Sequence, residues 1–280
     1  MSNRLSSIST AIEEALLSKN LRGMANIRPF LSDGYCLRAA KTLFEAKGVV
    51  LIGTGFPVTN TFETDGPLGA IALYKTLEKV GSTPYIVCGP PLSQAIKNEY
   101  RIVELKIGKH DAQDEEAKLI LDTLKPKVVF SIERPGKASD GHYYNMKGEN
   151  ISDRSACFDS LMDQATCETI AIGDGGNEIG MGNVSEALDS LDIVAAVTRC
   201  DELIISDVSN WGAYGLIAMI GKLANFDLLK EIKPLEILTY LSKLGSVDGI
   251  TRCNELTEDG HSLDVGDSLI LNLRKITQFY

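Results

Sequence analysis

Short apolar stretches alternate along most of the chain with longer segments in which apolar residues recur every three or four positions. The short stretches are apolar at nearly every position, which indicates β-strands that are buried on both faces of a sheet. The predicted strands are Val49–Gly53, Tyr85–Gly89, Ile102–Ile107, Val128–Glu133, Thr169–Gly173 and Leu203–Ser206.

The longer segments between these strands have the period of amphipathic helices. Strands that alternate with helices are typical of a parallel sheet covered by helices on both faces. We therefore predict an α/β fold with a doubly wound, mainly parallel, Rossmann-like sheet and helices on both faces. The predicted helices are Pro67–Val80, Leu92–Asn98, Asp111–Leu124, Ser155–Ala165 and Asn210–Leu223.

The length of 280 residues is sufficient for a single large α/β domain over residues 1–280. Residues 1–46 read as a helical segment that packs on this domain. Residues 244–280 are rich in Gly and Asp and are expected to form a C-terminal extension, as a hairpin, a lid or an oligomer contact. The polar connection Arg134–Asp153 is unusually long for a compact domain, which favours a functional role.

Composition narrows the classes of partner and compartment. The net charge of −10 argues against nucleic acid and anionic membranes as partners. No apolar run is long enough for a transmembrane helix, and the first residues lack the features of a secretory signal. The sequence therefore predicts a cytoplasmic protein, with no membrane partner and no nucleic acid partner.

The cysteines and histidines argue against disulfide bonds and against a His-rich zinc site. The six cysteines form no Cys-x-x-Cys pair, and several lie in strand-like runs, so we expect free thiols in a reducing compartment. The presence of only three histidines argues against a His-rich zinc site. The cysteines are Cys36, Cys88, Cys157, Cys167, Cys200 and Cys253.

Polar loops follow four of the predicted strands, and ligands of open parallel sheets bind at the carboxyl ends of the strands. In the first loop, Asp65 or Gly66 is expected to cap the helix that begins at Pro67, and this helix N-terminus suits a carboxylate or phosphate. Asp65 either serves catalysis or only caps the helix. The residues of this loop that we expect to bind substrate are Thr54, Gly55, Thr64 and Gly66.

The second loop follows the strand that ends at Glu133. Arg134 is expected to hold a substrate carboxylate in two-pronged geometry. Asp140 is a candidate acid or base, and Tyr143 and Asn145 are candidate substrate contacts. The alternative is a solvated surface loop in which the arginine pairs with the neighbouring glutamate.

The third loop is the glycine-rich turn IGDGGNEIG. Gly175, Gly176 and Asn177 would present successive N–H groups to a developing oxyanion. Asp174 and Glu178 stand beside them as acid, base or metal ligand. The alternative is a purely structural tight turn.

The fourth loop opens a helix with Asp207, Ser209, Asn210 and Trp211. An aromatic wall beside an amide suits a small polar ligand, so Asn210 and Trp211 are candidate substrate contacts. The alternative for Trp211 is a place in the core.

Long motifs in these loops identify a family. The strings TGFPV, ETDGPLGA, IERPGKASDGHYYNMKGENIS, IGDGGNEIGMGNV and GSVDGIT extend from about Thr54 to Thr251. The sequence resembles the C-terminal domain family of D-glutamate cyclase. The resemblance implies conversion of D-glutamate to 5-oxo-D-proline with loss of water. Longer relatives in this family carry a further N-terminal domain that resembles hydro-lyases.

The residues are compatible with that reaction, which needs two titrating groups with pKa values driven apart. Asp174 with Glu178, or Asp65 with Asp140, are the candidate pairs. Arg134 would hold the substrate α-carboxylate, and no cofactor is required.

Two alternatives stay open. The same loops could form a non-catalytic binding domain that senses an acidic amino acid or a nucleotide. A metal-dependent enzyme acting on a related small carboxylate could hold a divalent ion with Asp65, Asp174 and Glu178. In each case the partner is a small acidic molecule, and a homo-oligomer is compatible with the sequence.

Overall fold

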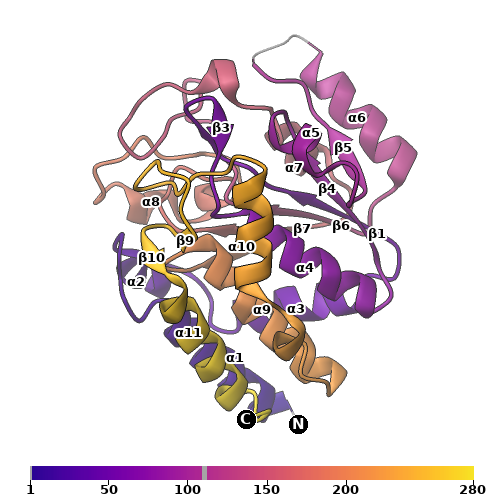
Figure 1. Ribbon diagram of the computed structural model, residues 1–280, viewed down its shortest axis with the longest axis vertical. Helices are drawn as coiled ribbons and strands as arrows, with labels where there is room; N and C mark the ends of the chain where they lie inside the picture. Colours follow the sequence, from indigo (N-terminus) through magenta and orange to yellow (C-terminus); the bar gives the residue numbers. More distant parts are fainter. Residues whose placement is uncertain (1, 109–111) are drawn as a thin grey trace.

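The computed structural model describes residues 2–108 and 112–280. Six strands form one parallel sheet in the order β5-β4-β1-β6-β7-β8 (Figure 1). The first strand therefore lies in the middle, and the chain winds outward from it in both directions. This confirms the predicted doubly wound α/β fold. The strands are β1 Val49–Gly53, β4 Thr83–Cys88, β5 Ile102–Glu104, β6 Val128–Ile132, β7 Glu168–Gly173 and β8 Glu202–Ile205.

Helices cover both faces of this sheet because successive side chains of each strand point to opposite faces. In β1, Val50 and Ile52 belong to one core, and Leu51 belongs to the other. The first core includes α3 (Tyr35–Glu45), α4 (Pro67–Lys79) and α9 (Ser209–Ala224). The second includes α6 (Gln113–Leu124) and α7 (Asp159–Gln164).

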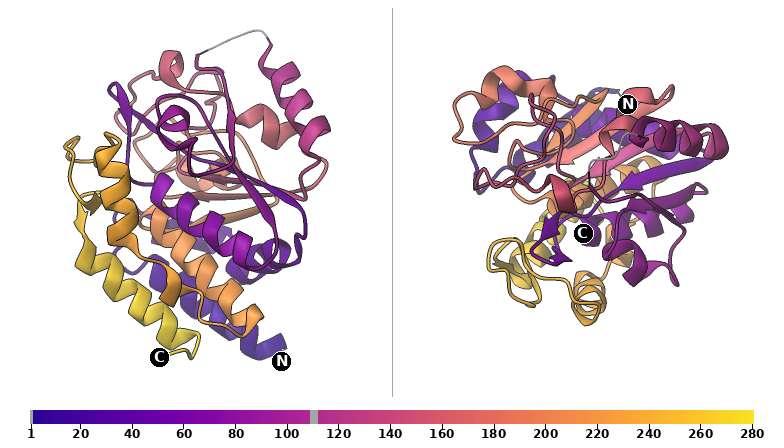
Figure 2. Two further views of the ribbon diagram at one scale, coloured as in Figure 1. Left: turned by 45° about the vertical axis from the view of Figure 1, so that its right-hand side comes forward. Right: turned by 90° about the horizontal axis from the view of Figure 1, so that it is seen from above.

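Three more helices form an outer layer over α3, α4 and α9, which makes one side of the molecule thicker. They are α1 (Ser2–Leu16), α10 (Pro234–Lys243) and α11 (Leu263–Ile276). Helices α1 and α11 lie side by side, so both chain termini are at the same end of the molecule (Figures 1 and 2).

Short elements connect these helices and strands and form two small hairpins. The hairpin β2–β3 follows β1, and the hairpin β9–β10 lies in the segment that the sequence predicted as a C-terminal extension. The remaining elements are α2 Met24–Ile27, η1 Arg28–Phe30, β2 Pro57–Val58, β3 Thr61–Phe62, α5 Leu92–Ile96, η2 Ser152–Arg154, η3 Met181–Val184, α8 Ser185–Leu188, η4 Leu229–Glu231, β9 Thr257–Glu258 and β10 His261–Ser262.

Most predicted boundaries differ from the observed ones by one to three residues, and the larger differences have physical reasons. Strand β6 ends before Glu133, whose φ of 45° is incompatible with a strand. Helix α7 begins four residues later than predicted, at Asp159. The predicted start of α6 at Asp111 lies outside the described residues. The helices α10 and α11 were not predicted.

The state of the cysteines and the length of the helices were both addressed by the sequence. All six cysteines are free thiols, and Cys36, Cys88 and Cys157 are buried whereas Cys253 is exposed. In the described part of the chain, no helix combines the length and apolar character that a bilayer crossing requires.

Candidate active site

A cavity of about 250 Å³ opens where the chain reverses its winding direction, between β1 and β6. Ligands of doubly wound sheets bind at this place. The loops after β1, β6 and β7 contribute to its wall, and so do segments near both chain ends. Its charged lining residues are Arg22, Glu63, Asp65, Glu133, Lys147, Glu149, Arg154, Asp174, Arg252 and Asp259.

The helices α4 and α9 cap each other beside this cavity. The Asp65 carboxylate accepts hydrogen bonds from the backbone N–H groups of Ser209 and Asn210, at 3.0 and 2.7 Å. The Asn210 side-chain oxygen accepts from the N–H groups of Gly66 and Gly69, at 2.9 and 2.8 Å. Of the two expected capping residues, Gly66 is the N-cap residue of α4, whereas the Asp65 carboxylate caps the N-terminus of α9 and Asn210 supplies the side-chain acceptor for α4.

The first residues of α9 donate hydrogen bonds to several carboxylates. The Ser209 N–H also donates to Asp174, at 3.1 Å, and the Ser209 hydroxyl donates to Glu133, at 2.5 Å. Because the positive end of a helix favours negative charge, the N-terminus of α9 attracts the carboxyl groups around it. The sequence predicted an anion site at the N-terminus of α4, whereas the N-terminus that bonds the carboxylates is that of α9.

The glycine-rich turn after β7 holds Asp174 and Glu178 close to each other. The Gly176 N–H donates to the Glu178 carboxylate at 2.7 Å, and Gly176 has a φ of 104° that a side chain would strain. That N–H group is therefore occupied by a carboxylate and is not free for the predicted oxyanion role. Asn177 lines the cavity, and its side-chain amide donates to the carbonyl oxygen of Tyr144 at 2.9 Å.

Arg22 and Asp259 enter the site from opposite ends of the chain. Arg22 forms an ion pair with Asp174, at 2.9 Å, and a second ion pair with Asp259. Asp259 lies in the turn between β9 and β10 with a φ of 53°. The hairpin thus delivers a carboxylate to a site that otherwise follows the sheet.

Burial raises the pKa of four carboxyl groups of the site. Burial, and then repulsion by Asp174, raises the pKa of Glu178 to about 8. Burial and the same repulsion raise the pKa of Asp259 to about 6, although Arg22 opposes this shift. Burial also raises the pKa of Asp65 and Glu133 well above the usual range. Carboxyl groups with such different surroundings can exchange protons near neutral pH.

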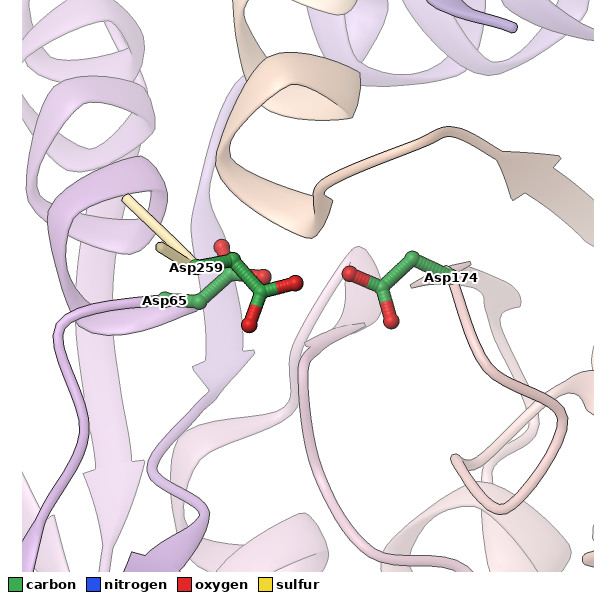
Figure 3. Close-up of side chains that lie close together, drawn as sticks. All are labelled: Asp65, Asp174 and Asp259. Carbon is green, nitrogen blue, oxygen red and sulfur yellow. The ribbon is translucent and has the colours of Figure 1, made fainter. Parts of the chain in front are cut away.

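Two groups of carboxylates share Asp174. Oxygens of Asp65, Asp174 and Asp259 lie within 4.8 Å of one another, and so do oxygens of Glu133, Asp174 and Glu178. Figure 3 shows the first group, in which Asp65 and Asp259 lie side by side and Asp174 points toward them from the opposite wall. The predicted metal-binding set of Asp65, Asp174 and Glu178 is thus divided between the two groups.

Arg134 is buried and bonded to the main chain. Its guanidinium donates to the carbonyl oxygens of Thr54 and Gly55, each at 3.1 Å, and to that of Ala156. These three residues and Arg134 line a separate cavity of about 20 Å³, which has room for about one water molecule. We therefore correct its expected role as a substrate clamp, because the Arg134 side chain instead links the loop after β1 to the main chain at Ala156.

Other predicted site residues lie outside the cavity. Asp140 is half exposed and accepts hydrogen bonds from the Tyr144 hydroxyl and the His142 N–H, so we assign it no catalytic role. The Tyr143 hydroxyl donates to buried Asp159, at 2.6 Å. Trp211 is buried and packs against the His261 ring, which favours its alternative place in the core.

The remaining predictions have mixed outcomes. Asn145 lines the cavity as expected. Thr64 is buried, and its hydroxyl donates to the carbonyl oxygen of Thr257 at 3.0 Å, below the hairpin. Gly66 uses its N–H in the cap of α4. Gly175 is held closely, because an added Cβ would lie 2.6 Å from the sulfur of Met146.

The sequence predictions missed Arg22, Glu63, Glu133 and Asp259 as site residues. Glu63 lies two residues before Asp65 in the same loop, so its position in that loop could have identified it. The turn sequence Asp259-Gly260 marks a hairpin, but it does not reveal where the hairpin packs. Arg22 has no local signal because it lies far from any strand end in the sequence.

Comparisons with known proteins identify the family of this chain. The chain matches the family described as D-glutamate cyclase-like, C-terminal, over residues 12–274. It is 31% identical over 221 residues to the human protein D-glutamate cyclase, mitochondrial. This similarity covers 69% of the chain and 36% of the human protein, so the chain spans about a third of the length of that relative.

Among solved structures, the chain is similar to an exopolyphosphatase-related protein from Bacteroides fragilis, with a TM-score of 0.46 and 13% identity over 89% of this chain and 62% of that one. A likeness of this level carries no functional argument. The family match extends over nearly the whole chain and includes every segment that lines the cavity. The chain therefore belongs to the D-glutamate cyclase-like family, and it matches the C-terminal part by which that family is described.

Proposed function

We propose that this chain is an enzyme that converts D-glutamate to 5-oxo-D-proline and water in the cavity between β1 and β6. Family membership supports this reaction class, and one observation of the cavity carries the proposal: its charges are separated by depth. The floor bears buried carboxylates, and the mouth bears three exposed or half-exposed cations and one exposed carboxylate, Glu149, which pairs with Arg154 at 2.6 Å and leaves the mouth with an excess of positive charge. The cations of the mouth are Lys147, Arg154 and Arg252.

This separation matches the charges of glutamate, which has one ammonium group and two carboxylates. The ammonium group is attracted to the floor, where Glu133 lines the cavity and a carboxylate oxygen of buried Glu178 lies within 4.8 Å of those of Glu133 and Asp174. The α-carboxylate is attracted to the cations at the mouth, above all to Arg252, because Arg154 already pairs with Glu149. A cavity of about 250 Å³ has room for a molecule of this size.

The reaction moves two protons from nitrogen to oxygen. The ammonium group loses a proton, the amine attacks the γ-carboxyl carbon, and the nitrogen loses a second proton as the C–N bond forms. The departing oxygen receives both protons and leaves as water. A carboxyl group that accepts a proton and then returns it can serve both steps, and Glu178, with a pKa of about 8, is suited to this exchange.

The purified chain incubated with D-glutamate tests the proposal. Chiral chromatography should detect 5-oxo-D-proline at a rate proportional to the protein concentration, and an L-glutamate incubation provides the matched control. If D-glutamate stabilises the protein against heat in a saturable manner without product, the chain is a binding domain and the proposal is wrong.

A further inference from the structure

We infer that Asp65, Asp174 and Asp259 bind a divalent cation of the magnesium or manganese class. The ion would lie in the cavity of the proposed function, which this inference deepens. It rests on that function only for the ion's chemical role and not for the binding itself.

The three carboxylates have the chemistry and spacing of such a site. Magnesium and manganese prefer oxygen ligands, and the ligand oxygens of Asp65, Asp174 and Asp259 lie within 4.8 Å of one another. They come from three segments that the fold holds independently: the start of α4, the turn after β7 and the β9–β10 hairpin (Figure 3). One ion can therefore contact all three without rearrangement of the main chain.

Existing contacts leave ligand oxygens available. The ion pairs of Arg22 are with Oδ2 of Asp174 and Oδ2 of Asp259. Within residues 2–108 and 112–280, the Oδ1 atoms of these two aspartates accept no hydrogen bond. Arg22 thus orients both carboxylates from one side and leaves one oxygen of each for the ion.

An independent observation comes from Asn177, which is 2% exposed and lines the same cavity. Its Nδ2 group donates to Tyr144, whereas its Oδ1 atom is buried without a donor in the described part of the chain. An added Cβ on Gly175 would lie 3.1 Å from this Oδ1, 2.8 Å from Oε1 of Glu178 and 2.6 Å from the sulfur of Met146, so the Asn177 oxygen lies close to the glycine-rich turn that carries Asp174.

A buried oxygen acceptor without a donor, such as Asn177 Oδ1, needs a cation or a water molecule beside it. Magnesium in proteins usually retains several water molecules. Water bound to an ion at Asp174 would supply this donor, because Asn177 lines the same cavity as Asp174. A hydrated ion therefore accounts for the unpartnered Asn177 oxygen as well as for the cluster of carboxylates.

The charge of the cavity favours the same conclusion. Six buried carboxyl groups lie in or beside the cavity, and the half-buried guanidinium of Arg22 pairs with two of them among the described residues. A buried carboxylate is costly without a compensating charge, and a divalent ion would supply two positive charges to those that are ionised. With the substrate bound, the ion would polarise the γ-carboxyl group for attack by the amine. The carboxyl groups are those of Glu63, Asp65, Glu133, Asp174, Glu178 and Asp259.

Binding of the ion can be measured without substrate. Full-length protein is treated with a chelator, dialysed and titrated with MnCl2, and electron paramagnetic resonance measures the free ion. We expect saturable binding of Mn²⁺ in the micromolar to millimolar range, with competition by MgCl2. No binding up to millimolar MnCl2 would overturn the inference.

Variants test the assigned ligands. Asp259→Asn and Asp174→Asn should each weaken Mn²⁺ binding by about tenfold or more, and Asn177→Ala by less, since it contacts the ion through water. Asp122→Asn on the exposed face of α6 is the matched control. Circular dichroism verifies the fold of each variant, and unchanged binding in both folded aspartate variants would contradict the assignment.

The metal site and the proposed function fail in distinguishable ways. If the chelated protein still forms 5-oxo-D-proline at the full rate and binds no Mn²⁺, the metal site is wrong and the proposed function stands. If the protein binds Mn²⁺ at these aspartates and forms no product with the ion present, the metal site stands and the proposed function is wrong.

Discussion

At the scale of single residues, the site depends on charges that the fold buries at a cost. Ser209 shows how this cost is reduced, because its N–H and hydroxyl bond three carboxylates that come from three different loops. Charge-assisted hydrogen bonds of this kind are about twice as strong as neutral ones. Glu178 accepts a hydrogen bond from the Gly176 N–H, but burial and repulsion by Asp174 outweigh this bond and raise the pKa of Glu178 to about 8.

We expect Glu178→Gln to lower the turnover of D-glutamate by about a hundredfold, because an amide cannot accept and return a proton. The fold should persist, since the amide oxygen can still accept from Gly176. Chiral chromatography of the product measures the rate. Glu186→Gln, an exposed change on α8, is the control, and equal turnover in the two variants would exclude Glu178 from proton transfer.

Arg134→Ala should reduce the free energy of unfolding by about 3 kcal/mol, because it leaves three carbonyl oxygens without their donor and removes a buried side chain. Urea unfolding measures this change. Arg101→Ala removes an exposed ion pair with Glu78 and should change the free energy of unfolding much less than Arg134→Ala does. An Arg134→Ala protein of full stability with a raised KM would restore the clamp role.

At the scale of elements, α4 and α9 form one unit through their exchanged caps. Gly69 permits this approach, because an added Cβ would lie 3.0 Å from the Cβ of Ala213 on α9 and 2.7 Å from Ile132. The unit fixes Asp65 relative to Asp174, so the geometry of the acidic site follows from the packing of two helices. This is why the site is precise although loops supply its side chains.

Asn210→Ala tests this unit. It removes the acceptor of the Gly66 and Gly69 N–H groups, and we expect a loss of about 1 to 2 kcal/mol in the free energy of unfolding. Metal binding should weaken as well, because Asp65 loses its fixed position. Asn98→Ala at an exposed position is the control for urea unfolding. A stable variant with normal Mn²⁺ binding would show that the caps do not position Asp65.

At the scale of the whole molecule, both chain ends are structural parts of the site. Glu13 of α1 is buried and accepts from the N–H groups of Gly34 and Cys36, each at 3.2 Å, which fixes α1 to the start of α3. Arg22 follows α1, and Asp259 precedes α11, which packs beside α1. The outer layer of helices therefore brings the Arg22–Asp259 ion pair to the sheet edge.

The acidic site also predicts how the stability of the whole molecule depends on pH. Glu178 and Asp259 have raised pKa values of about 8 and about 6, so the folded protein binds more protons than the unfolded chain between pH 4.5 and 8. The free energy of unfolding of the metal-free protein should therefore fall as the pH rises through this range. The charged groups that face these two carboxyls are Arg22, Glu63, Asp65, Glu133, Asp174 and Asp248.

Thermal unfolding of chelated protein at pH 6 and at pH 8 measures this effect, and the melting temperature should be lower at pH 8. Glu178→Gln should reduce the difference, because it removes the group that titrates highest. A melting temperature that rises from pH 6 to pH 8 in the chelated protein would contradict the assignment of repelling carboxylates.

The sequence by itself determined the sheet and the loops that carry the chemistry. Apolar runs such as Val49–Gly53 are long enough to specify strands buried on both faces, and their alternation with helices specifies parallel pairing. The rule that ligands bind at the carboxyl ends of parallel strands then brought Asp65, Asp174 and Asn177 into one site. Local periodicity and short-range turn chemistry are sufficient for this much.

Only the tertiary structure decided which polar group faces which partner. Whether the Arg134 guanidinium meets a ligand or the main chain depends on side-chain direction at a loop, and no sequence period encodes that direction. The contribution of Arg22 and Asp259 depends on how α1 and α11 pack, because residues more than two hundred positions apart meet through apolar faces that have many alternative partners. The charge balance of the site is a property of these long-range contacts.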